Sequence, residues 1–138
     1  IKLDSNGSRP GVLQHLLDQE LVDFISMDIK TAPDRYSLVV SEKFDIEKIH
    51  ESIRIVMSAA PAYEFRTTCS RPFVSEEILD RIGKLVSGAS RYVLAKCSRT
   101  VKVLDSDFIK SDNHFFTDRD MAVLGRVLDP YVQQVVVR

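Results

Sequence analysis

The stretch V-D-F-I-S-M-D-I-K, from Val22 to Lys30, decides the fold class. Its nearly continuous apolar run is typical of a parallel strand that is buried on both faces. A carboxylate and an ammonium, Asp28 and Lys30, follow where the strand should end, and both point to the same side because side chains alternate along a strand. Ligands of sheets built from strand–helix units bind outside the carboxyl ends of the strands, so we expect these two side chains to line a pocket. The alternative is a strand that ends in an ordinary polar loop.

The rest of the chain alternates strands and helices around this stretch. We predict the tail of a strand at Ile1 to Leu3, a turn at Asp4 to Gly7, and further strands at Ala62 to Thr68, Arg91 to Lys96 and Gln133 to Val137. Polar residues follow three of these strands as well, which favours the pocket over an ordinary loop. The alternation implies right-handed βαβ units and a parallel sheet.

Helices are predicted wherever apolar residues recur at helical spacing after a capping residue. The expected caps are Ser8, Asp45, Ser75 and Thr117, and Thr117 forms a capping box with Asp120. The first helix should bury one stripe, made of Val12, Leu13, Leu16, Leu17 and Leu21. A short helix is possible within residues 31–40, and residues 101–114 are expected to be a loop.

Composition excludes several classes of protein. With 138 residues the chain forms a single domain, 1–138, and its net charge of -1 gives no reason to expect nucleic acid or an anionic membrane as partner. No apolar run is long enough to span a bilayer. Two cysteines without a C-x-x-C spacing are too few for a disulfide framework, so a reducing, cytoplasmic setting is expected. The chain begins in mid-strand without a methionine, and we expect an N-terminal part of the parent protein to precede it.

Four blocks of sequence together resemble a known family. They are K-L-D-S-N-G-S at 2–8, V-D-F-I-S-M-D-I-K at 22–30, Y-E-F-R-T-T at 63–68 and R-Y-V-L at 91–94. In this order they resemble the later part of radical S-adenosylmethionine activating enzymes, such as the activating proteins of anaerobic ribonucleotide reductase and pyruvate formate-lyase. The resemblance implies a parallel-sheet, partial TIM-like barrel, of which this chain supplies only the later βα units.

The resemblance also implies an activity and its cofactors. In this family a 4Fe–4S cluster and S-adenosylmethionine produce a 5′-deoxyadenosyl radical, which generates a glycyl radical on a partner enzyme. The cluster-binding C-x-x-x-C-x-x-C loop and the glycine-rich motif of the family are absent from this sequence, so both are expected in the preceding part. Cys69 and Cys97 cannot replace closely spaced thiolates and are expected to be buried or incidental.

Site residues follow from matching the family's motifs. The aspartate-x-lysine pair falls on Asp28 and Lys30, where it would hold the ribose hydroxyls of S-adenosylmethionine. Asp4 and Ser5 match an aspartate-threonine pair, which in some members helps to bind a monovalent cation, here possible at Asp4 and Asp28. Arg66 matches an arginine that faces the cofactor and the polypeptide substrate. The loop after Thr68 departs from the family, since Cys69-Ser70-Arg71-Pro72 replaces two valines, a proline and a glycine; Ala95 replaces a common glutamine.

Two other functions remain open at this point. One is a Schiff-base aldolase on a βα barrel, with Lys30 or Lys96 as the amine and Asp28 as its proton partner. The other is a non-catalytic remnant that binds a partner through the open sheet edge at Ile1 to Leu3, which would favour a homo-oligomer.

Overall fold

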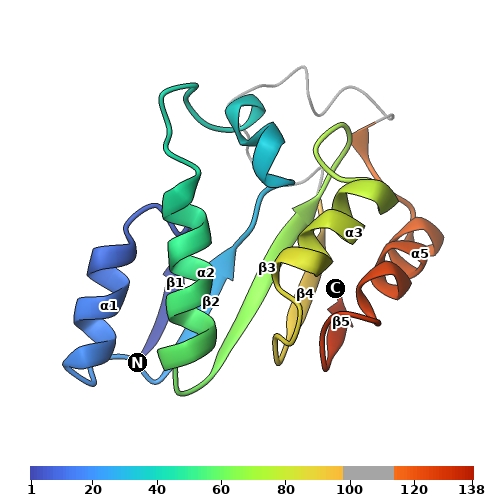
Figure 1. Cartoon of the computed structure of the whole chain (residues 1–138). Helices are drawn as coiled ribbons and strands as arrows, with labels where there is room; N and C mark the ends of the chain where they lie inside the picture. Colours follow the sequence, from blue (N-terminus) through green and yellow to red (C-terminus); the bar gives the residue numbers. More distant parts are fainter. Residues whose placement is uncertain (98–113) are drawn as a thin grey trace.

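Five strands pair in the order in which they occur along the chain, all of them parallel (Figure 1). This computed structural model describes residues 1–97 and 114–138, so the loop predicted over residues 101–114 lies outside it except for its last residue. The predicted α/β class and parallel sheet are confirmed. The strands are β1 (Lys2–Ser5), β2 (Phe24–Asp28), β3 (Tyr63–Cys69), β4 (Tyr92–Lys96) and β5 (Val135–Val137).

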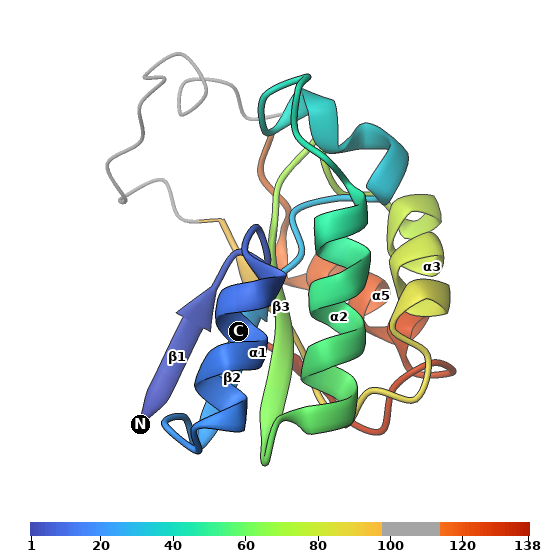
Figure 2. The ribbon, with the colours of Figure 1, turned by 60° about the vertical axis from the view of Figure 1, so that its left-hand side comes forward.

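The helices of the described residues lie on one face of the sheet. A right-handed crossover that always moves to the next strand in the same direction places every helix on the same side, and Figures 1 and 2 show this arrangement. None of the described helices is long and apolar enough to cross a membrane. The elements are α1 (Pro10–Asp18), the short 3-10 helix η1 (Pro33–Leu38), α2 (Glu47–Ala59), α3 (Glu76–Leu85) and α5 (Asp118–Leu128).

The hydrophobic core lies between the sheet and the helices. Alternate residues of each strand face the helices, and each large side chain that is removed completely from water stabilises the fold by about 1.5–3 kcal/mol. The core side chains of the strands include Ile25, Met27, Phe65, Tyr92 and Leu94, all of them fully buried.

The opposite face of the sheet carries polar residues. The strand register aligns Asp4 with Ser26 and Ser26 with Glu64, and two residues further along it aligns Asp28 with Arg66. Because side chains two apart on a strand share a face, these five residues form two polar rows on the side away from the helices. The fold therefore separates the face that packs against the helices from a face that carries these polar rows, on which Ser26, Glu64 and the apolar Val93 are nevertheless buried.

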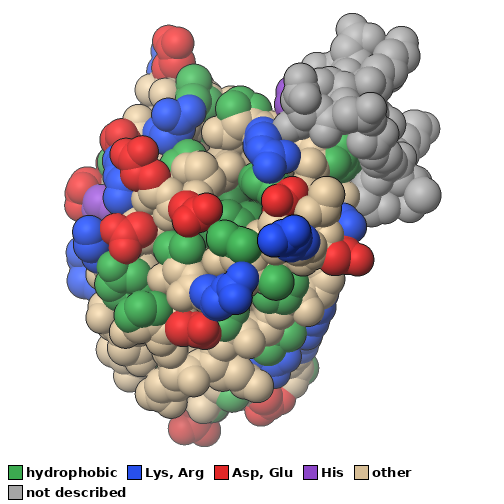
Figure 3. Space-filling view, turned by 90° about the vertical axis from the view of Figure 1, so that its right-hand side faces the viewer, with side chains coloured by type: hydrophobic (Ala, Val, Ile, Leu, Met, Phe, Trp, Pro, Cys, Tyr) green, Lys and Arg blue, Asp and Glu red, His purple; other side chains and the backbone are tan. Residues whose placement is uncertain are grey.

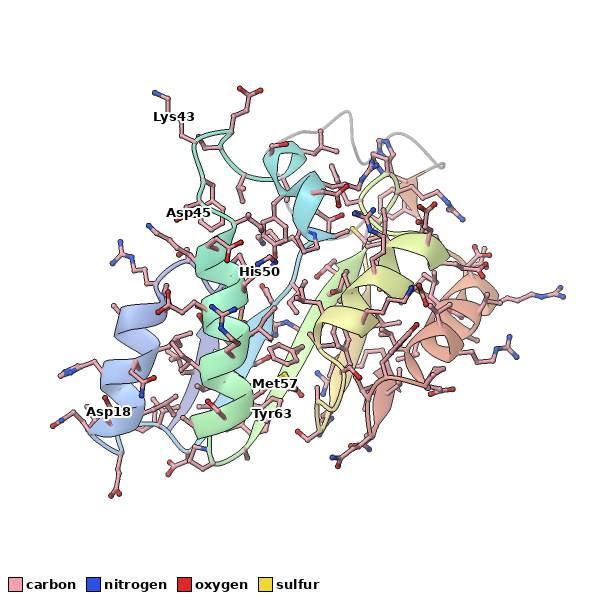
Figure 4. The ribbon with its side chains drawn as sticks, in the orientation of Figure 1. Asp18, Lys43, Asp45, His50, Met57 and Tyr63 are labelled. Carbon is pink, nitrogen blue, oxygen red and sulfur yellow. The ribbon has the colours of Figure 1, made fainter. Side chains whose placement is uncertain are left out.

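Two of the four predicted caps, Ser75 and Thr117, are the N-caps of their helices, whereas the N-cap of α2 is Ile46, one residue after the predicted Asp45. Ser75 Oγ accepts a hydrogen bond from the Ile78 N–H at 3.1 Å, and the Thr117–Asp120 capping box is present. Asp45, at the N-terminal end of α2 in Figure 4, accepts from the Glu47 N–H at 3.0 Å. Each bond satisfies a backbone donor that the helix itself leaves without a partner.

Three expectations for the first strand–helix unit are wrong. Ser8 does not cap α1: the N-cap is Arg9, and the Ser8 N–H donates to Asn6 Oδ1 within the preceding turn. Val12 and Leu21 are 49% and 50% exposed, because the side of α1 that faces the core carries Leu13 and Leu17 instead. Asp4 and Ser5 belong to β1 rather than to a turn, since pairing with β2 continues to the end of that strand.

The turn after β1 requires a glycine at position 7. Gly7 has a φ of +72°, and a Cβ there would overlap the Met27 methyl group. We predict that Gly7→Ala destabilises the fold by about 3 kcal/mol, from left-handed backbone strain and an overfilled core together. Gly11→Ala is the matched control, because a Cβ at position 11 meets nothing within 4 Å. The control should be neutral or stabilising by about 0.5 kcal/mol. Urea unfolding measures both changes, and equal effects would contradict this account of the turn.

Candidate functional site

An ion pair between neighbouring strands marks the carboxyl end of the sheet. Arg66 Nε donates to Asp28 Oδ1 at 2.8 Å, and both side chains are about two-thirds buried. The pKa of Arg66 is raised, first by the hydrogen bond to Asp28 and then by the charges of Asp28, Asp4 and Glu64. The guanidinium is thus held among three carboxylates on the open face of the sheet.

A cavity of about 260 Å³ opens beside this ion pair. It brings together three of the residues predicted from the sequence, Asp28, Lys30 and Arg66. Its volume lies slightly below the range of about 300–1,000 Å³ that is usual for small-molecule sites, so it suits one part of a ligand, such as a sugar. The remaining lining residues come from the end of η1 and from the strand ends and loops around it: Ile29, Val39, Thr68, Ser70 and Phe73.

Asp4 and Ser5 do not line this cavity. Asp4 is exposed and lies 3.9 Å from Lys2 Nζ, although its charge still reaches Arg66 across the open face. Ser5 points to the opposite face, where its Oγ accepts from the Gly7 N–H at 3.0 Å. Both residues line a separate cavity of about 420 Å³ between the end of β1 and the start of α1. The five predicted residues therefore divide into a group of three and a group of two.

Two residues of the second polar row, Ser26 and Glu64, are missing from the sequence-based predictions, whereas its third residue, Asp4, was predicted. Glu64 is only 3% exposed, accepts a hydrogen bond from Ser26 Oγ at 2.9 Å, and forms an ion pair with Arg91 at 3.4 Å. The signal was available, because Glu64 stands two residues before Arg66, and Ser26 two before Asp28. Strand alternation alone would have placed both residues on the face of the site.

The cysteines do not form a metal site. Cys69 is fully buried, and burial raises the pKa of its thiol to about 12; the pKa of the half-buried Cys97 is raised for the same reason. Within residues 1–97 and 114–138, no three His, Cys, Asp or Glu side chains are grouped as metal ligands. These thiols do not suit an iron–sulfur cluster, which is held by several thiolates.

The lysines do not favour Schiff-base chemistry. Lys96 Nζ is 2.7 Å from Asp118 Oδ1, and Lys30 is exposed to solvent. Asp28, the expected proton partner, is bonded to Arg66 instead. Burial in an apolar pocket is one way to activate a Schiff-base lysine, and both lysines are exposed instead.

A larger cavity of about 510 Å³ lies between the start of α3 and α5. Figure 3 shows the side of the molecule that carries α5, where apolar side chains are scattered among charged ones. Arg71 lines this cavity, but its guanidinium already donates to the Phe115 carbonyl at 2.9 Å and lies 4.0 Å from the centre of the Phe116 ring. We therefore place the candidate site at the smaller, more polar cavity.

One curated protein shares sequence with the whole chain. It comes from Methanocaldococcus jannaschii, carries the provisional name glycyl-radical enzyme activating enzyme, and is 26% identical over 142 residues. The resemblance to glycyl-radical enzyme activating enzymes is confirmed. The alignment covers 100% of this chain and 58% of the relative. No protein-family profile matches the chain, and no solved structure matches it significantly.

The two thiols should differ in reactivity. Raising the pKa of Cys69 from 9.0 to about 12 lowers its thiolate fraction at pH 8 about a thousandfold, and its side chain is also buried. We expect iodoacetamide at pH 8 to modify Cys97 faster than Cys69, which should react only after unfolding in urea. Mass spectrometry of native and unfolded samples measures this, with Cys97→Ser as the control. Rapid modification of Cys69 in the native protein would contradict its described burial.

Proposed function

We propose that this chain is the C-terminal portion of a glycyl-radical activating enzyme and that its strand-end cavity binds part of S-adenosylmethionine. The observation that carries the proposal is the grouping of Asp28, Lys30 and Arg66 around one cavity at the carboxyl ends of parallel strands. Ligands of this type of sheet bind at that edge. The named relative supports the same class of enzyme.

Each residue has a role that its chemistry permits. Among the described residues the Asp28 carboxylate uses Oδ1 for Arg66, which leaves Oδ2 to accept hydrogen bonds from the two ribose hydroxyls. The Lys30 ammonium donates to ligand oxygens. Arg66 holds Asp28 through Nε and offers its terminal N–H groups to a carboxylate or to a backbone carbonyl of the polypeptide substrate. Asp4 lies on the same face of the sheet, where its negative charge would help to bind a monovalent cation.

The chain supplies binding and orientation rather than the whole reaction. Bound S-adenosylmethionine supplies the sulfonium group on which the chemistry of this class depends. The iron–sulfur cluster does not fit this chain, because the chain has two cysteines and one of them, Cys69, is fully buried. Its ligands must come from another part of the parent protein, and the chain alone is expected to be inactive.

The proposed partner is a glycyl radical enzyme of the anaerobic ribonucleotide reductase or pyruvate formate-lyase type. Support comes from the name of the relative and from Arg66, which lines the cavity and whose guanidinium suits a polypeptide carbonyl. A Schiff-base aldolase is not supported, because neither Lys30 nor Lys96 is desolvated.

Binding of S-adenosylhomocysteine, a stable analogue, tests the site. We predict that the chain binds it and that Asp28→Asn weakens binding by about tenfold to a hundredfold, the value of a hydrogen bond to a charged group. Asp18→Asn is the matched control, because Asp18 lies at the far end of α1 (Figure 4). Isothermal titration calorimetry measures all three proteins.

Two results would contradict this proposal. One is a wild-type chain that is folded, as judged by circular dichroism, and does not bind S-adenosylhomocysteine at millimolar concentration. The other is equal loss of affinity in Asp28→Asn and Asp18→Asn, which would place the ligand elsewhere or reveal a non-specific effect of charge.

A further inference from the structure

Both polar groups of one peptide bond, between Ile29 and Lys30, are held by buried side-chain hydroxyls. Thr67 Oγ1 donates to the Ile29 carbonyl oxygen at 2.6 Å, and the Lys30 N–H donates to the Tyr36 hydroxyl at 3.0 Å. This peptide lies one residue beyond the end of β2, directly after the bond in which the Ile29 N–H donates to the Arg66 carbonyl at 2.8 Å. Its plane is therefore fixed by side chains on both sides.

The bond from Thr67 continues to a third hydroxyl. Tyr92 OH lies 2.6 Å from Thr67 Oγ1, and a threonine hydroxyl has a single proton, which is directed to the Ile29 carbonyl. Tyr92 must therefore be the donor to Thr67. A chain of hydrogen bonds thus leads from β4 through β3 to the end of β2.

These three hydroxyls lie in the hydrophobic core, where burying a polar group is costly. Thr67, Tyr92 and Tyr36 are 1%, 0% and 3% exposed, and burial raises the pKa of Tyr36 to about 12 and that of Tyr92 further, so both phenols stay protonated. Valine and phenylalanine would fill the same volumes without the cost of burying a hydroxyl. Buried hydroxyls usually form hydrogen bonds wherever they lie in a core, so the presence of the bonds needs no special explanation. This tendency does not explain why two of them meet at one peptide.

The position of that peptide gives the hydroxyls a function. It joins Asp28 and Ile29 to Lys30, and all three residues line the strand-end cavity. The next residue is tethered too, because Thr31 Oγ1 donates at 2.6 Å to the carbonyl of Phe73, another lining residue. A peptide with only one bonded end could rotate about its flanking dihedral angles and swing the Lys30 side chain away.

We propose that Thr67, Tyr92 and Tyr36 form a hydroxyl clamp, which fixes the Ile29–Lys30 peptide and so holds Asp28 and Lys30 in one orientation for the ligand. These are positioning residues, since they touch the peptide rather than the ligand. Orientation before binding avoids the entropy cost of ordering the site when the ligand arrives. The part concerning the ligand depends on the proposed function, whereas the clamp itself can be tested without a ligand.

Amide hydrogen exchange of the ligand-free chain tests the clamp. Thr67→Val keeps the shape of the side chain and removes the bond to Ile29, so we expect exchange of the Lys30 amide to become about tenfold faster even though Tyr36 is intact. Thr67→Ser keeps the hydroxyl and should exchange like the wild type. Tyr63→Phe is the matched control: Tyr63 begins β3 at the opposite end of the sheet, and its hydroxyl accepts from the Ser90 N–H (Figure 4).

Affinity for S-adenosylhomocysteine tests the consequence for the site. We expect Thr67→Val to bind about tenfold more weakly, and Thr67→Ser and Tyr63→Phe to bind within twofold of the wild type. All measurements are made at a temperature where urea unfolding shows each variant to be folded. If Thr67→Val does not fold, Tyr36→Phe replaces it, since this change removes the hydroxyl that accepts from the Lys30 N–H and should speed exchange of the same amide.

The outcomes separate the two proposals. An unchanged Lys30 amide in Thr67→Val, or an equal increase in Tyr63→Phe, would overturn the clamp. Unchanged affinity despite faster exchange would overturn its role in positioning the site. A wild-type chain that does not bind the analogue would overturn the proposed function, while selective exchange at Lys30 would still support the clamp.

Discussion

The structure depends on one topological constraint, the one-directional order of five parallel strands joined by right-handed crossovers. This order gathers the carboxyl ends of the strands at one edge and gathers the helices on one face. Within residues 1–97 and 114–138 no helix lies on the other face, which carries the two polar rows. Both the location of the candidate site and its polarity follow from this single arrangement.

The polar face is stable because its charges are paired between neighbouring strands. Arg66 is bonded to Asp28, while the more deeply buried Glu64 is bonded to Ser26 and paired with Arg91. A charged group in a buried position is tolerated only when it is paired and hydrogen-bonded. The charges of Glu64 and Asp4 also favour the Arg66 guanidinium, which remains partly exposed to a ligand together with the Asp28 carboxylate.

The sequence predicted the elements better than their contacts. Hydrophobic periodicity placed β2, and alternation placed Asp28 and Lys30 on one side, because both signals are local. The pairing of Asp28 with Arg66 depends on strand register, which no local pattern contains. Glu64 was missed although alternation puts it beside Arg66, since a glutamate within a strand was not read as part of a face. The exposure of Val12 was also missed, because helical spacing alone does not show which side of a stripe meets the core.

The central claim is that a nucleoside ligand binds at the ends of β2 and β3. Backbone amide NMR spectra of the chain, recorded during titration with S-adenosylhomocysteine, test it most directly. The account predicts saturable shifts that are largest for residues lining the strand-end cavity, among them Lys30, Arg66 and Thr68. Shifts concentrated at the cavity between α3 and α5, around Val74 and Leu124, would contradict it, as would the absence of any shift.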